Sequence, residues 1–234
     1  MIDVTPFEKL GAFRNEWLDT HHHFSFADYH DPNRMGWGAL RVWNDDEIEP
    51  GTGFGMHPHR DMEIITYVRR GAITHRDNLG NEGVTGPGDV QVMSAGTGIT
   101  HAEVNAGSEK VVLFQIWIMP DRRGVKPRWE TRQFPKHGRL GKLVPLASGR
   151  PEDAGAGAMM IHQNAAILGA TLAAGETLVH TLAPGRKAYL VPTTGRLTVN
   201  GVDVPARAGV AVTGESVLTI RADQPTEIIV ADVA

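Results

Sequence analysis

Short strand-like segments, separated by turns that contain glycine or proline, recur along most of the chain, and this pattern constrains the fold more than any other feature. The 27 glycines and 14 prolines suit frequent chain reversals better than long helices. In LTVNGVDV, Asn200 and Gly201 suit the two positive-φ positions of a type I′ hairpin turn. The sequence therefore predicts an all-β barrel or sandwich. The strand-like segments are 39–43, 63–68, 72–75, 88–93, 111–119, 127–134, 187–193, 196–199, 217–220 and 226–233.

The strand pattern is interrupted once, between about residues 135 and 160. The segment PKHGRLGKLVPLASGRPEDAGAGAMM is rich in glycine, alanine and proline and poor in alternation. After residue 161 the hairpins resume, much like those of 40–120. We interpret the segment as the passage between two similarly built domains, an N-terminal domain of residues 1–134 and a C-terminal domain of residues 135–234.

Composition excludes several classes of function. The net charge of −4 and the pI near 6.2 give no basic surface for nucleic acid or an anionic membrane. The absence of cysteine excludes thiolate nucleophiles and thiolate metal sites. MIDVTPFEKLGAF lacks the apolar core of a signal peptide, and no apolar run reaches the roughly 18 residues of a membrane span. We expect a cytoplasmic protein without nucleic-acid or membrane partners.

Two histidines flank a proline in the strand-like segment GFGMHPHRDMEI. His57 and His59 are two residues apart, so on a strand they project from one face and can bind the same metal ion. Pro58 belongs at a sheet edge or a bulge, because it has no N–H for a ladder hydrogen bond. Such a motif alone is weak evidence, since His21 and His23 have the same spacing.

A second pair of possible ligands follows in SAGTGITHAEVN. His101 and Glu103 repeat the spacing of two, and Gly96 and Gly98 just before them allow close backbone approach. Two inward-facing pairs on two strands supply three imidazoles and a carboxylate, a set that suits a divalent transition metal. The coincidence of both pairs therefore predicts a metal site. We expect His75 to be an ordinary strand histidine, with a place beside the ligands or in the pocket as the alternative.

Both segments resemble known motifs. GTGFGMHPHRDME resembles the first cupin motif, and GTGITHAEVN resembles the second. H-P-H-R…E together with S-A-G-x-G-I-x-H-x-E is similar to the pirin family, as are FSFADYHDP, ALRVWNDD, ITHRD and QIWIMP, over about residues 17–134. The resemblance implies a bicupin, in which two cupin jelly-roll barrels pack face to face and only the N-terminal one holds a complete metal site.

The resemblance also implies a ligand set and a metal. It assigns His57, His59, His101 and Glu103 as ligands of one ion, expected to be Fe(II), with Zn, Mn, Ni, Cu or Co as alternatives. Glu63, whose counterpart binds metal in most cupins, then becomes a residue behind the ligands. After residue 161 only two histidines remain, 18 positions apart, so the second domain is expected to be degenerate.

The function implied by the resemblance is oxidative. Some pirin-like proteins cleave quercetin, so we expect a mononuclear-metal dioxygenase that opens the ring of a flavonol-like phenolic substrate with O₂ and releases CO. Glu103 would then be catalytic and take the enol proton. The alternative is a regulatory module, like the transcriptional co-regulators of this family, whose metal or redox state controls binding of a protein partner.

Overall fold

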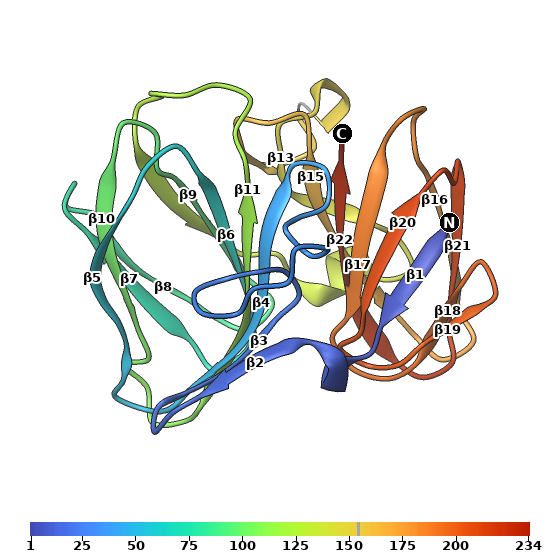
Figure 1. Cartoon of the computed structure of the whole chain (residues 1–234), viewed down its shortest axis with the longest axis horizontal. Helices are drawn as coiled ribbons and strands as arrows, with labels where there is room; N and C mark the ends of the chain where they lie inside the picture. Colours follow the sequence, from blue (N-terminus) through green and yellow to red (C-terminus); the bar gives the residue numbers. More distant parts are fainter. Residues whose placement is uncertain (154) are drawn as a thin grey trace.

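Antiparallel strands are the main secondary structure of the computed structural model, which describes residues 1–153 and 155–234 (Figure 1). Two barrels lie side by side, and each combines a seven-stranded with a four-stranded sheet. Three short 3₁₀ helices connect strands: η1 (Phe7–Lys9), η2 (Lys136–Arg139) and η3 (Pro151–Asp153). The expected all-β bicupin architecture is confirmed.

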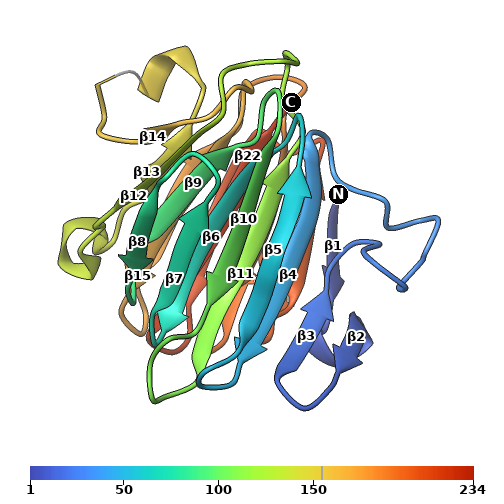
Figure 2. The same ribbon diagram turned by 90° about the vertical axis from the view of Figure 1, so that its left-hand side faces the viewer.

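The first barrel contains the predicted metal-binding segments. Its smaller sheet covers the larger one in Figure 2 and has the order β5-β10-β7-β8. Its larger sheet has the order β12-β9-β6-β11-β4-β3-β2. The strands are β2 (Gly11–Arg14), β3 (Leu18–His22), β4 (Leu40–Ile48), β5 (Gly53–His59), β6 (Glu63–Arg70), β7 (Ile73–Asp77), β8 (Glu82–Thr85), β9 (Val90–Ser94), β10 (Ile99–Val104), β11 (Val111–Ile118) and β12 (Arg128–Arg132).

The second barrel repeats this plan with different lengths. Its larger sheet has the order β1-β20-β17-β22-β15-β13-β14, and its smaller sheet has the order β16-β21-β18-β19. The strands are β1 (Ile2–Thr5), β13 (Val144–Ser148), β14 (Met159–Met160), β15 (Ala166–Leu172), β16 (Thr177–Thr181), β17 (Lys187–Pro192), β18 (Leu197–Val199), β19 (Val202–Val204), β20 (Gly209–Thr213), β21 (Val217–Ala222) and β22 (Thr226–Val233).

The two larger sheets face each other across one shared apolar core. Alternation along β4 explains the arrangement: Trp43 is fully buried in this inter-barrel core, whereas Asn44 and Asp46 face the interior of the first barrel. Tyr189 and Ile229 contribute to the same core from the second barrel. The packing face to face that the resemblance implied is therefore present, and it directs the polar residues of β4 toward the candidate site.

Ion pairs join the barrels beside this core. Asp45, fully buried on β4, accepts hydrogen bonds from Arg69 of the first barrel and from Arg207 of the second, with Arg207 Nε 2.7 Å from Asp45 Oδ2. The Arg69 guanidinium also packs over the ring of Phe114, 4.2 Å from its centroid. A buried carboxylate held by two arginines fixes the position of β4 relative to the second barrel.

One sequence-based expectation differs from the structure, and another is confirmed. The passage expected between the domains contains β13, which belongs to the second barrel, and its register shifts between Pro145 and Ala147. A proline at a bulge hides the alternation of that strand from sequence analysis. The Asn200–Gly201 turn is confirmed, because both residues have positive φ and Val199 pairs with Val202.

The chain passes from the second barrel to the first between β1 and β2. β1 pairs with β20 in the sheet of the second barrel, although β2 and β3, which follow, belong to the first. The domain boundary between residues 134 and 135 stays a prediction. Among the described residues, no helix is both long and apolar enough to cross a membrane.

Candidate metal centre

The predicted histidine pair lies on β5, and the strand pairing brings it to the second predicted pair. His57 lies opposite His101 on β10, and His59 lies opposite Ile99. Because β5 is the outermost strand of its sheet, Pro58 sits in an edge strand, as predicted. The three histidines that the sequence placed in two segments therefore converge at one end of the first barrel.

The three imidazole rings lie close enough to bind one ion. Their centroids are 4.8 Å apart for His57 and His59, 4.5 Å for His57 and His101, and 5.0 Å for His59 and His101. One ring nitrogen from each lies within 4.8 Å of the other two. His59 also packs edge-on against Trp117, with centroids 5.0 Å apart, which restrains its ring.

Hydrogen bonding leaves ring nitrogens free for a metal. His57 Nδ1 lies 2.7 Å from the carbonyl oxygen of Gly55 and donates to it, so its lone pair is on Nε2. His101 Nε2 is buried and has no hydrogen-bond partner among the described residues. An unpartnered buried polar atom costs on the order of 1–3 kcal/mol. A metal ion among the three rings removes that cost, so the residues present fit such an ion.

Electrostatics keep the site in its metal-binding form. Burial, followed by the charge of the neighbouring His57, lowers the pKa of His59 to about 4. Burial, followed by the charges of His57 and His59, lowers the pKa of His101 to about 2. Both imidazoles are therefore neutral at pH 7, which is the form that coordinates metal ions.

Glu103 lies on the wall of the same pocket but is held by other side chains. The amide groups of Gln91 and Gln115 donate hydrogen bonds to its carboxylate, the latter at 2.9 Å, and Thr66 Oγ1 donates at 3.2 Å. A register shift between His101 and Glu103 separates the two along β10. Burial raises the pKa of Glu103, while the nearby His75 and the hydrogen bonds from Gln115 and Thr66 oppose the rise. Its role as a fourth ligand stays a prediction.

A pocket of about 180 Å³ opens beside the histidines, inside the first barrel. It adjoins a groove of about 440 Å³ that reaches outward between β2, β3 and the segment 26–29, and the two share several wall residues. Sequence analysis did not identify most of the walls, since alternation marks a strand face without showing what it faces. The pocket is lined by Leu18, Thr20, His22, Phe26, Asn44, Asp46, Phe54, His57, His59, Ile64, His101, Glu103, Gln115 and Trp117.

Comparison with known proteins identifies the family. The chain matches the family model described as Pirin over residues 4–118 and the one described as quercetinase C-terminal cupin domain over residues 146–233. It is 57% identical over 234 residues to a pirin-like protein of Caulobacter vibrioides, covering all of both chains. The chain belongs to the pirin family.

Two further comparisons carry more specific descriptions. The quercetin 2,3-dioxygenase of Escherichia coli strain K12 is 42% identical over 233 residues, which cover 99% of this chain and 98% of that one. The crystal structure of bacterial pirin YhhW from Escherichia coli in complex with nickel(II) matches with a TM-score of 0.93 at 41% identity, covering 100% of this chain and 99% of that one.

A second acid lines the pocket of this pirin. Asp46 is 2% exposed and accepts a hydrogen bond from Thr20 Oγ1. Burial raises its pKa to about 7, and the nearby charges of Asp45 and Glu103 act in the same direction. The pocket therefore holds two carboxyl groups that readily bind protons, Asp46 on β4 and Glu103 on β10.

Glu63 lies on the other side of β6 from the pocket, as expected for a residue behind the ligands. Its neighbour Ile64 lines the pocket, so alternation turns Glu63 away from it. Glu63 Oε2 accepts a hydrogen bond from Ser94 at 2.7 Å, and Oε1 lies 3.1 Å from His162 Nδ1. Burial raises the pKa of Glu63, although both hydrogen bonds oppose the rise.

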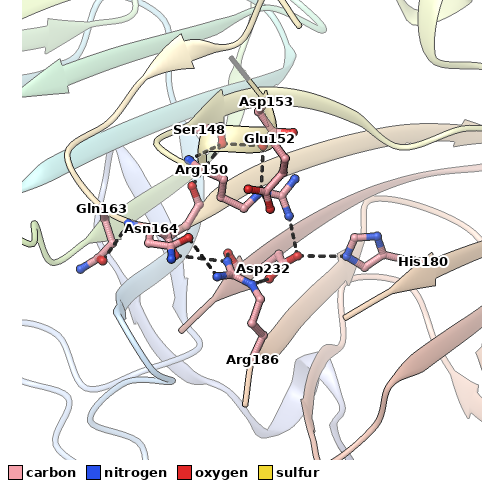
Figure 3. Close-up of polar contacts among 10 residues, drawn as sticks. Ser148, Arg150, Glu152, Asp153, Gln163, Asn164, His180, Arg186 and Asp232 are labelled. Atoms are coloured by element: carbon pink, nitrogen blue, oxygen red, sulfur yellow. Dashed lines mark hydrogen bonds and ion pairs between the residues drawn. The ribbon is translucent and has the colours of Figure 1, made fainter. Parts of the chain in front are cut away.

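The remaining histidine of the second barrel joins an ionic cluster (Figure 3). His180 Nε2 lies 3.2 Å from Asp232 Oδ2, and the same carboxylate accepts hydrogen bonds from Arg150 and Arg186. Asp232 is 1% exposed and lies on the same face of β22 as the barrel-core residue Val230. Within the described part of the chain, the single group of three metal-binding side chains is that of His57, His59 and His101.

Proposed function

We propose that this pirin is a mononuclear-metal dioxygenase that opens the ring of a flavonol such as quercetin with O₂ and releases CO. One observation carries the proposal: three imidazoles, of which His59 and His101 are neutral, converge at a pocket that also contains the buried carboxyl group of Glu103. Relatives described as quercetin 2,3-dioxygenase support the same reaction. Acid–base catalysis does not require three imidazoles around one point, whereas an open metal site does require them.

His57, His59 and His101 would hold the ion, with Glu103 as the proposed fourth ligand. Imidazole and carboxylate donors suit Fe(II), and the same set accepts Zn, Mn, Ni, Cu or Co. The nickel complex of a relative supports a divalent transition metal without deciding among these. Such an ion would act as a Lewis acid toward the enol oxygen of the flavonol and would allow electron transfer to O₂.

Glu103 is the proposed proton acceptor. Burial raises its pKa, so it can hold the proton released by the 3-hydroxyl group of the flavonol. The amides of Gln91 and Gln115 keep the carboxyl group in one orientation beside the pocket. In the overall reaction the two ring bonds to the hydroxyl-bearing carbon break, that carbon leaves as CO, O₂ is incorporated, and the proton returns to the carboxylic acid product.

The pocket walls suit a flat phenolic molecule. Phe26, Phe54 and Trp117 offer apolar and aromatic surface, and Thr20 and Asn44 offer polar groups for hydroxyls. A volume of about 180 Å³ is small for three rings, since pockets for drug-sized ligands measure roughly 300–1,000 Å³. The adjoining groove would therefore receive the ring that lies farthest from the metal.

Quercetin consumption with simultaneous CO measurement tests the proposal. The purified protein is loaded with Fe(II) without O₂ and mixed with quercetin with and without O₂. We expect O₂-dependent loss of the flavonol absorbance and one CO per flavonol consumed. A His57→Ala protein is the control. Consumption no faster than in this control would reject the enzymatic proposal in favour of the regulatory alternative.

A further inference from the structure

His75, which is outside the proposed ligand set, lies directly against one of the ligands. Its Nδ1 is 3.3 Å from His101 Nδ1, and its Nε2 is 3.0 Å from Asp77 Oδ2. The pairing of β7 with β10 sets this arrangement, because His75 lies opposite Glu103 and Asp77 lies opposite His101. The alternative considered for His75, a place beside the ligands, is therefore what the structure shows.

The hydrogen bonds of Asp77 fix the direction of this chain. Asp77 Oδ1 accepts from the backbone N–H groups of Leu79 at 2.9 Å and Asn81 at 3.0 Å. Asp77 Oδ2 accepts from the Asn81 side-chain amide at 2.8 Å and faces His75 Nε2. A carboxylate surrounded by donors only accepts, so His75 Nε2 must carry a proton.

The tautomer of each histidine then follows from the one before it. A His75 ring with one N–H, on Nε2, has a lone pair on Nδ1. That lone pair accepts the Nδ1–H of His101, so His101 has its own lone pair on Nε2. His101 Nε2 is the buried atom without a partner among the described residues, next to the other two imidazoles. The chain of hydrogen bonds therefore presents the metal-binding lone pair at the centre.

Packing holds the middle member of this chain in place. The imidazole of His75 stacks on the indole of Trp129 from β12, with centroids 4.5 Å apart and planes 4° from parallel. The His75 side chain is fully buried. A ring fixed by stacking cannot turn to offer its other nitrogen, so the direction of the hydrogen bonds is maintained.

We propose that Asp77 and His75 are positioning residues that hold His101 in its Nδ1–H tautomer and thereby aim its Nε2 at the metal. The inference rests on the metal centre of the proposed function and not on the reaction catalysed there. Groups that orient a ligand histidine in this way usually raise metal affinity, and their loss costs about 10- to 100-fold.

Asp77→Asn tests the proposal with almost no change in volume. The backbone N–H groups of Leu79 and Asn81 hold the carbonyl oxygen of the new amide, so its NH₂ group faces His75 Nε2, and the Asn81 side chain must turn its amide oxygen toward that NH₂ group. His75 must then carry its proton on Nδ1, and His101 must move its proton to Nε2, where it blocks the metal. We expect Ni²⁺ affinity, measured by competition with a chromophoric chelator, to fall about 10- to 100-fold.

A second variant separates hydrogen bonding from packing. His75→Phe keeps a ring to stack on Trp129 and removes the acceptor for His101. We expect a similar loss of Ni²⁺ affinity together with a lower thermal unfolding midpoint, because His101 Nδ1 loses its buried partner. Arg76→Ala, on the same strand but with its side chain exposed, is the matched control and should bind Ni²⁺ like the wild type.

Nuclear magnetic resonance reads the tautomers without any metal or substrate. Long-range ¹H–¹⁵N spectra of the metal-free protein should show His101 protonated on Nδ1 in the wild type and on Nε2 in Asp77→Asn. A wild-type His101 protonated on Nε2 would overturn the inference, as would Ni²⁺ affinities of both variants within twofold of the wild type. Failure to oxidise quercetin would instead reject the proposed reaction and leave these results unaffected.

Discussion

His162, from the second half of the chain, places its Nδ1 3.1 Å from Oε1 of Glu63, a residue of the first barrel. The two residues are 99 positions apart in the sequence, and Glu63 is 1% exposed. The contact lies on the opposite side of β6 from the pocket wall residue Ile64. The second half of the chain therefore helps to satisfy a buried carboxyl group behind the metal centre.

Removing this contact should lower stability without weakening metal binding. In His162→Ala, Glu63 keeps only Ser94 as a side-chain hydrogen-bond partner, so we expect a loss of about 1–3 kcal/mol in the free energy of unfolding.

Glu63→Gln should bind Ni²⁺ like the wild type, because residue 63 faces away from the three imidazoles. Chelator competition checks this, and a tenfold weaker affinity in Glu63→Gln would show that Glu63 is a ligand.

Glu103→Gln should separate metal binding from turnover. The three imidazoles remain, so we expect Ni²⁺ binding to weaken by about tenfold or less, whereas loss of the proton acceptor should lower kcat by about 10²- to 10⁴-fold. The measurements are chelator competition and quercetin consumption at saturating metal. Equal losses in binding and turnover would show that Glu103 serves only as a ligand.

Asp46 should make the metal-free protein less stable as the pH rises. Its pKa is raised by burial to about 7, whereas an unfolded chain has the ordinary value of 3.8. The folded state therefore retains a proton that the unfolded state has lost. The retained Asp46 proton contributes its full share to the free energy of unfolding below about pH 4. This share is lost as the pH rises toward 7, by up to about 1.4 kcal/mol per pH unit.

Urea unfolding of the metal-free protein at pH 5, 6 and 7 checks this sign. Asp46→Asn should remove this part of the pH dependence, so its stability should decline less between pH 5 and 7 than that of the wild type. Asp203→Asn, at an exposed position of β19, is the control and should follow the wild type. Parallel curves for Asp46→Asn and the wild type would contradict the prediction.

Asp232→Asn should destabilise the second barrel. The substitution leaves the guanidinium groups of Arg150 and Arg186 without their shared buried carboxylate, which costs about 3–5 kcal/mol for a buried ion pair. Asp223→Asn removes a partly exposed partner of Arg221 and should cost less than about 1 kcal/mol. Urea unfolding measures both, and equal effects would show that burial of the Asp232 cluster adds nothing.

Sequence analysis predicted the parts of the site that depend on local spacing. His57 and His59 share a face because they are two apart on one strand. The hairpin at Asn200 follows from the backbone conformation that this residue and its glycine neighbour allow. Each of these features is set by residues next to one another in the sequence.

What sequence analysis missed depends on pairing between distant segments. Asp46 appears in ALRVWNDD as a polar residue near a strand end, and only the pairing of β4 with β3 places it beside Thr20 inside a pocket. His75 meets His101 through the register of β7 with β10. Such registers are decided by the packing of whole sheets, which alternation within one strand does not encode.

The pairing of β1 with β20 has a consequence for how the protein is made. Ile2 lies opposite Val212, so β1 cannot pair until a partner about 200 residues farther along the sequence has been synthesised. Contacts so distant in sequence close slowly, because a long loop must lose its freedom first. We expect this sheet to close only after β20 has been synthesised, and the nascent chain to need protection of β1 until then.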